Sequence, residues 1–100
     1  MAVRYNAVFK KTSDMVYISH LDLMNLFRRA FRRAGLPFVL TEGFTPRIKI
    51  SIPQALKLGV ESNNEHMSFL LSKEKDVRDI AGVLNKELPE GIRILDVKIV

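Results

Sequence analysis

The sequence contains no cysteine, and this absence removes several kinds of chemistry. Disulfide bonds, thiolate metal sites, an iron–sulfur cluster held by the chain itself and a cysteine nucleophile are all excluded. A catalytic triad, a glycine-rich phosphate loop and a closely spaced pair of carboxylates are missing as well. These absences favour a binding domain over an enzyme, and we expect no catalytic residue, no metal and no cofactor.

No apolar run approaches the roughly 18 to 20 residues that a membrane-spanning helix needs. The first residues alternate apolar and polar side chains and lack the apolar core of a signal peptide. We expect a soluble, cytoplasmic protein that does not contact membranes. The 100 residues contain no linker, repeat or low-complexity stretch, and 47% of them are hydrophobic, so a single domain over 1–100 is expected.

Acidic side chains are scarce in the first part of the chain. Residues 1–59 contain ten Lys and Arg against three acids, a net charge of +7, whereas residues 60–100 contain six against eight, a net charge of −2. The overall charge of +5 therefore arises in the first part. This distribution favours nucleic acid, an acidic protein surface or a phosphorylated ligand as the partner.

The hydrophobic pattern predicts an ordered series of elements, because alternation is typical of strands and recurrence at three and four positions is typical of helices. The expected strands are 3–9, 48–52, 67–71 and 92–100, with a short extended piece at 38–40. The expected helices are 19–35 and 73–88. This order predicts an α+β fold, the ferredoxin-like split βαβ sandwich, in which two helices cover one face of an antiparallel sheet.

Local signals mark several element ends. Ser19 followed by Asp22 fits a capping box with Asp in place of Glu, and Gly35 is expected to end the same helix. In the last strand the alternation changes phase between Ile94 and Leu95, which indicates a bulge or burial on both faces.

Two smaller features carry expectations about packing. The connection over 53–64 contains Leu56, Leu58 and Val60, so we expect it to fold over the core. Gly82, inside the second predicted helix, is expected to be a position of close packing.

Four arginines share one side of the first predicted helix. They are Arg28, Arg29, Arg32 and Arg33. At about 100° per residue they fall within roughly 140° of one another, while apolar side chains occupy the opposite arc. Because guanidinium groups make bidentate bonds to phosphate and stay charged at any relevant pH, this ridge fits a phosphate-tracking surface. Pairing with protein carboxylates and plain solvation are the alternatives.

Four more residues are candidates for contact with an anion. His20 lies at the start of the helix, where it can donate to a phosphate or serve as a general acid in RNA cleavage, or else pack locally. Phe44 lies in a turn and either stacks on a base or folds back into the core, with Gly43 supplying a positive φ. Arg47 and Lys49 fall on the outer face of the next strand. That face is either open or covered by a further part of the protein.

A set of short motifs resembles the radical-SAM-linked protein family, over nearly all of the chain. The motifs are Ser19-His20-Leu21-Asp22-Leu23, Arg28-Arg29-Ala30-Phe31-Arg32-Arg33-Ala34-Gly35-Leu36-Pro37, Glu42-Gly43-Phe44-Thr45-Pro46, Ala55-Leu56 with Gly59, Ser62 with Glu65, and Leu84-Asn85 with Leu88-Pro89-Glu90-Gly91. The resemblance implies a domain encoded beside, or fused to, cobalamin-binding radical SAM proteins. It also implies that these 100 residues are the N-terminal half of a longer protein.

Together, the resemblance and the charge pattern predict an accessory domain that partners a radical SAM protein and binds RNA or another polyanion through its basic helix face. The chain lacks the cysteines of a radical SAM enzyme, so the partner would generate the radical. One alternative is a protein interaction module that docks on an acidic surface of that partner. A weaker alternative is a metal-independent ribonuclease that uses His20.

Overall fold

The computed structural model describes residues 2–54 and 57–100. Its elements are β1 (Val3–Lys11), the 3-10 helix η1 (Ser13–Tyr17), α1 (His20–Ala34), β2 (Ile50–Ser51), β3 (Ser62–Leu71), α2 (Val77–Glu87) and β4 (Ile92–Ile99). Ala55 and Leu56, which contribute to the family resemblance and to the predicted packing of the 53–64 connection, lie outside the described residues.

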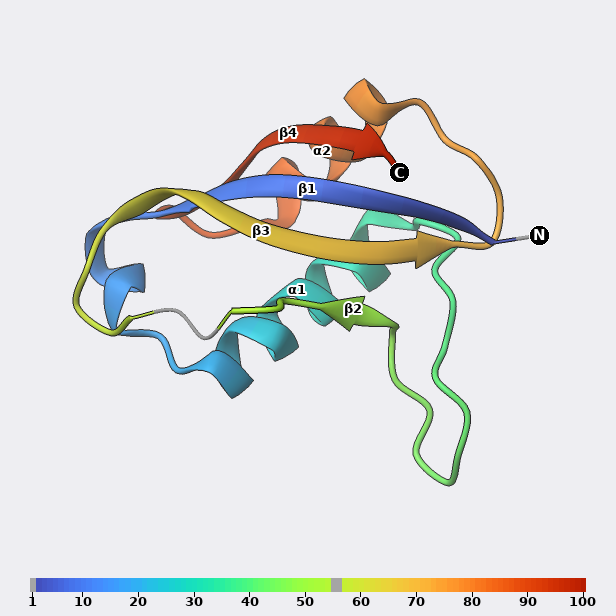
Figure 1. Ribbon diagram of the computed structural model, residues 1–100, viewed down its shortest axis with the longest axis horizontal. Coiled ribbons are helices and arrows are strands. Elements are labelled where there is room, and N and C mark those ends of the chain that lie inside the picture. Colours follow the sequence, from blue (N-terminus) through green and yellow to red (C-terminus); the bar gives the residue numbers. More distant parts are fainter. Residues whose placement is uncertain (1, 55–56) are drawn as a thin grey trace.

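The four strands form one antiparallel sheet in the order β2-β3-β1-β4. Both helices lie on the same face of this sheet (Figure 1). The predicted α+β class, with two helices against an antiparallel sheet, is therefore confirmed. β1 and β3 are the two inner strands, and β2 and β4 form the two edges.

The ends of α1 follow the predicted capping chemistry. The Ser19 hydroxyl accepts a hydrogen bond from the backbone N–H of Asp22 at 3.1 Å, which satisfies one of the free donors at the helix start. Gly35 adopts a left-handed conformation with φ of 71°, and its N–H donates to the Arg32 carbonyl at 3.1 Å. The first helix thus begins and ends where the sequence predicts.

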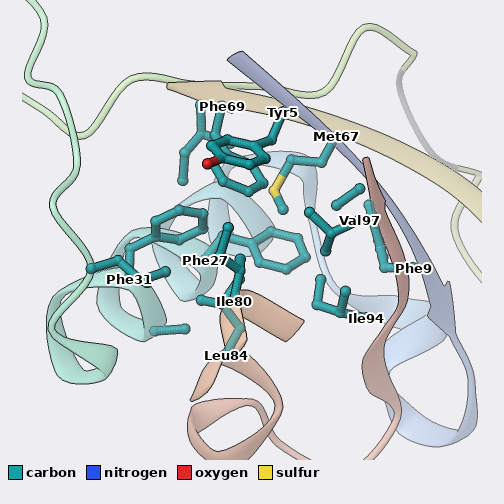
Figure 2. Packing of buried hydrophobic residues seen from close by; sticks show 14 of the residues in the cluster. Tyr5, Phe9, Phe27, Phe31, Met67, Phe69, Ile80, Leu84, Ile94 and Val97 are labelled. Carbon is teal, nitrogen blue, oxygen red and sulfur yellow. The ribbon is translucent and has the colours of Figure 1, made fainter. Parts of the chain in front are cut away.

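The core lies between the sheet and the two helices and is built around aromatic side chains (Figure 2). Tyr5 of β1 stacks on Phe69 of β3 with ring centroids 5.4 Å apart. From α1, Phe31 meets Phe69 edge to face at 4.9 Å, and Phe27 meets Phe9 in the same manner at 5.0 Å. Because these rings join three elements, they fix α1 and its outer basic face against the sheet.

The second helix begins at Val77, four residues later than the predicted start at residue 73. Lys75 donates its backbone N–H to the Tyr5 hydroxyl at 2.9 Å, and its carbonyl accepts from the same hydroxyl at 3.2 Å. Asp76 then caps the helix by accepting a 2.8 Å hydrogen bond from the N–H of Arg78. Asp76, the residue before Val77, has an extended backbone, and the Tyr5 hydroxyl holds Lys75 just before it.

The phase change in the last strand is a bulge, as one of the two sequence interpretations predicts. Val8 of β1 pairs with Asp96, whereas the next residue, Phe9, pairs with Ile94, so Leu95 is the extra residue. The Asn85 side chain of α2 holds this point, because its amide donates to the Ile94 carbonyl at 3.1 Å and its carbonyl accepts from the Ile94 N–H at 2.7 Å.

Two packing expectations are wrong. Gly82 is exposed on α2, and a Cβ added there would meet nothing within 4 Å, so no close approach requires a glycine. Leu58 and Val60 are 63% and 50% exposed, so in the described part of the 53–64 connection these side chains do not fold over the core. Apolar composition alone does not bury a loop, because burial needs a partner surface that strands and helices have left uncovered.

Candidate anion-binding groove

Residues 38–50 form a hairpin that projects from the edge of the sheet, between α1 and β2 (Figure 1). Its two arms are joined by a bridge between Leu40 and Ile48, by a 2.8 Å hydrogen bond from the Lys49 N–H to the Val39 carbonyl, and by further bonds near the tip. This pairing explains why the regular strand is shorter than the predicted 48–52. The arms pair with each other, Ile50 and Ser51 pair with β3 as a short strand, and Phe38 adds an isolated bridge to Leu71 of β3.

Near the hairpin tip, Thr41 and Arg47 hold the two arms together. The Thr41 N–H donates to the Arg47 carbonyl at 2.7 Å, and the Arg47 N–H donates to the Thr41 hydroxyl at 3.0 Å. The backbone of Arg47 is therefore fixed by two hydrogen bonds, while its side chain is exposed. This arrangement places a cation at a defined position beside α1.

A groove of about 540 Å³ lies between α1 and the hairpin, and we call it the arginine groove. It is lined by Leu21, Asn25, Arg28, Arg29 and Arg32 of α1 and by Thr45, Pro46 and Arg47 of the hairpin. Four guanidinium-bearing residues from two separate segments thus share one open depression. Basic residues around a concave surface concentrate positive potential where a ligand would lie.

Arg28 lies deepest among these cations, because it is half-buried whereas Arg29, Arg32 and Arg47 are exposed. Its Nε donates to the Ile48 carbonyl and one of its Nη atoms donates to the Asn25 side-chain oxygen, both at 3.4 Å. Since a guanidinium carries five N–H donors, these two bonds leave others for a ligand.

The four arginines of the groove carry like charges that no described carboxylate neutralises. Burial, followed by the charges of Arg47 and Arg32, lowers the pKa of Arg28 below its ordinary value. Within residues 2–54 and 57–100, the one ion pair within 4.0 Å joins Lys98 and Asp96, on β4. No described carboxylate therefore pairs with a groove arginine at that distance.

The structure brings together part of the set of residues that the sequence singles out. Arg28, Arg29, Arg32 and Arg47 line the arginine groove. The remaining candidates, Arg33, His20, Lys49 and Phe44, are exposed but are not among its lining residues. Phe44 lies at the hairpin tip next to the groove residue Thr45, with its side chain fully exposed, so the interpretation that folds it into the core does not hold.

Residues 4–100 match the model of a family described as an uncharacterised protein conserved in bacteria (DUF2344). The chain belongs to this family. A search of curated proteins gave no match. The family match runs from the second residue of β1 through β4, and so it includes α1, the hairpin and every residue of the arginine groove.

In this DUF2344 chain, sequence reasoning missed four lining residues of the groove, namely Leu21, Asn25, Thr45 and Pro46. Asn25 is one helical turn before Arg28 and Arg29, on the same side of α1. Thr45 and Pro46 directly precede Arg47 in the turn and line the groove with it. Their spacing was visible in the sequence, but the docking of the turn against α1 was not.

A second feature that sequence reasoning missed is the burial of Lys11. Its side chain is 1% exposed, and its Nζ donates to the Lys57 carbonyl at 2.7 Å. The residue continues the inward alternation of β1 and borders a separate depression of about 270 Å³ that Glu61 and Glu65 also line. Because acids share this depression with the lysine, it is a poorer match for an anion than the arginine groove.

The helix-free face of the sheet is polar with mixed charge. Val8 in its centre pairs with His66 on one side and with Asp96 on the other, and Asn6 pairs with Lys98. This face therefore carries both acidic and basic groups. Within the described ranges, no group of three or more His, Asp and Glu is placed to hold a metal ion.

Neither α1 nor α2 is long and apolar enough to cross a membrane. Helix α1 has 15 residues and α2 has 11.

Proposed function

We propose that this domain binds RNA through the arginine groove, as an accessory to a radical SAM enzyme and without catalytic activity of its own. One observation carries the proposal. The groove gathers Arg28, Arg29, Arg32 and Arg47 from two segments, and no described carboxylate lies within 4.0 Å of them. Like charges held together cost folding free energy, and an anion that binds between them removes that cost.

Phosphate is the anion whose chemistry suits this groove best. A guanidinium is planar and presents paired N–H donors that match two phosphate oxygens. Exposed Arg29 and Arg32 are free to reorient, whereas half-buried Arg28 is oriented by the Ile48 carbonyl and by Asn25. The groove thus combines one pre-oriented guanidinium with three adjustable ones, an arrangement that can follow a phosphate backbone.

The radical SAM part of the proposal is supported by the short motifs of the sequence, among them the segments that build α1 and the hairpin tip. Because the chain has no cysteine, radical chemistry would belong wholly to the partner. This domain would then present an RNA substrate to that enzyme. The prediction is that the two proteins purify together from cells.

Charge reversal in the groove tests the RNA proposal. In Arg29→Glu with Arg32→Glu, two exposed groove cations become acids, and we expect affinity for single-stranded RNA at about 50 mM salt to fall at least a hundredfold. The matched control is Arg78→Glu with Lys86→Glu on α2, which changes the net charge equally but away from the groove. We expect the control to stay within severalfold of the unmodified protein. Fluorescence anisotropy measures both.

Three results would contradict the proposal. Equal losses in the two double variants would show that only net charge matters. A radical SAM protein that stays bound after nuclease treatment, and is lost in the groove variant, would make the groove a protein-docking surface. Cleavage of the RNA in EDTA that disappears in His20→Ala would make the domain a ribonuclease.

A further inference from the structure

Phe44 is an aromatic side chain that the fold leaves wholly outside the core. Its relative exposure is 108%, whereas Phe9, Phe27, Phe31 and Phe69 are buried at 2% or less. A fully exposed phenylalanine gains nothing from folding, because its apolar surface stays in water. Such a side chain fits a role in contact with a ligand, and the groove next to it indicates which ligand.

Phe44 lies close to the groove along the chain, and hydrogen bonds hold this part of the hairpin in place. Thr45 and Pro46, the two residues after Phe44, line the groove, and Arg47 follows them. At most about 11 Å of backbone separates Phe44 from Arg47, since a chain extends no more than about 3.6 Å per residue. The hydrogen bonds between Thr41 and Arg47 hold the base of this tip in place.

We propose that the arginine groove and Phe44 together form a site for single-stranded nucleic acid, in which the groove binds phosphates and a neighbouring unpaired base stacks on the Phe44 ring. This inference rests on the proposed function and narrows it to a class of substrate. A single strand offers free base faces, and stacking on an aromatic ring is tolerant of base identity. In a duplex each base face is covered by its neighbours, so Phe44 would find no partner.

The rest of the described surface does not supply this stacking contact. The outward positions in the middle of β1 and β3 carry Asn6, Val8, His66 and Ser68, so the sheet has no phenylalanine or tyrosine platform there. Tyr17, at the end of η1, is the other largely exposed aromatic at 72%, but it does not line the groove. Tyr17 therefore serves as the matched control for Phe44.

Three labelled probes separate stacking from charge. They are a single-stranded oligouridylate of about ten nucleotides, an RNA duplex of the same length, and inorganic polyphosphate, which has charges but no bases. For Phe44→Ala we expect affinity for the single strand to fall about tenfold or more and affinity for polyphosphate to stay unchanged. Tyr17→Ala should alter neither. Because Phe44 is exposed, its variants should keep the melting temperature of the unmodified protein, which a thermal scan checks.

A tryptophan at the tip provides a direct readout. The chain has no tryptophan, so Phe44→Trp introduces a single fluorophore at the proposed contact. We expect this variant to keep the affinity for the single strand and its emission to be quenched by the oligouridylate but not by polyphosphate, because quenching requires a base against the ring.

The outcomes distinguish this inference from the function on which it rests. Unchanged binding of the single strand by Phe44→Ala, or equal affinity for duplex and single strand, overturns the stacking site while leaving the groove as an anion site. Binding of polyphosphate without binding of RNA does the same. If the Arg29→Glu, Arg32→Glu protein binds every probe as tightly as the unmodified protein, the groove itself is wrong, and the stacking site falls with it.

Discussion

At the scale of single residues, Arg28 shows most clearly that the charges of the groove repel one another in the folded protein. Burial and two like charges lower its pKa, which means that the folded protein disfavours the charged form of this group relative to a free arginine. Arginine nevertheless remains protonated at every relevant pH. The repulsion therefore stays in the folded state as a cost, and an anionic ligand relieves it.

Removing one of these neighbours should stabilise the protein. Of the two neighbouring arginines, Arg47 lowers the pKa of Arg28 more than Arg32 does, and the Arg47 side chain is exposed. With Arg47→Gln, we expect the melting temperature at low salt to rise by about 1–2 °C, since like-charge pairs cost a few tenths of a kcal/mol. At about 1 M salt, where the Debye length is about 3 Å, the gain should vanish.

The control for this prediction is Lys49→Gln, an exposed cation on the same hairpin that is not among the groove residues and does not act on Arg28. We expect it to leave the melting temperature unchanged. Calorimetry at two salt concentrations measures both variants. A gain that persists at high salt would mean that Arg47 acts through packing instead of charge.

At the scale of elements, the side chain of Asn85 makes hydrogen bonds that join α2 to β4, beside the apolar packing of both elements in the core. The Asn85 amide bonds both backbone groups of Ile94, just before the bulge at Leu95, in the way a neighbouring strand would. It therefore satisfies a donor and an acceptor at the edge strand and fixes the register beyond them.

Replacing Asn85 should destabilise this edge. For Asn85→Ala we expect a loss of about 1–3 kcal/mol in the free energy of unfolding, because the partly buried N–H and C=O of Ile94 lose their partners. Hydrogen exchange at the Ile94 amide should quicken. Lys86→Ala, one residue along α2 and exposed, should change the stability little. If exchange at the Ile94 amide stays as slow as in the unmodified protein, another group or a water molecule accepts the hydrogen bond of the Ile94 N–H, which would contradict the prediction.

The prediction of elements from sequence succeeded where local chemistry decides and failed where distant partners do. The capping of α1 by Ser19 and Gly35 depends on neighbours a few residues away, and both end residues were predicted. The start of α2 was not, because the Tyr5 hydroxyl holds the backbone of Lys75 from 70 positions away in the sequence. A prediction from the residues next to Lys75 in the sequence cannot include a contact with a residue so far away.

At the scale of the whole molecule, the charge is divided between its parts, with +7 in residues 1–59 and −2 in residues 60–100. The first part includes α1 and the hairpin, so the groove lies in the basic part of the chain. Such a division orients an approaching polyanion toward the groove before any contact forms and raises the association rate at low salt.

The salt dependence of binding reports how many phosphates the groove neutralises. Each phosphate contributes a slope of about −0.7 to a plot of log affinity against log salt for a single strand, so four groove cations predict a slope of roughly −2 to −3. Arg29→Glu with Arg32→Glu should flatten it. Phe44→Ala should lower the affinity at every salt concentration without changing the slope, since stacking releases no counterions. Titrations at several salt concentrations measure this, and a slope near zero would exclude phosphate contacts.

The sequence by itself determined the order of the helices and strands, the two end residues of α1 and the side of α1 on which the arginines stand, and it offered the bulge at Leu95 as one of two interpretations. All of these follow from helical and strand periodicity and from backbone chemistry over a few residues. The order of these elements also sufficed for the fold class, because few arrangements bury two amphipathic helices against one sheet.

Only the tertiary structure decided that Arg47 faces Arg28, that Arg33 lies outside the groove, and that Phe44 stays in solvent. Each depends on how the hairpin docks beside α1, and docking is set by contacts between segments far apart in the sequence, such as that between Arg28 and the Ile48 carbonyl. Periodicity gives the direction in which a side chain points. The packed fold gives what it meets there.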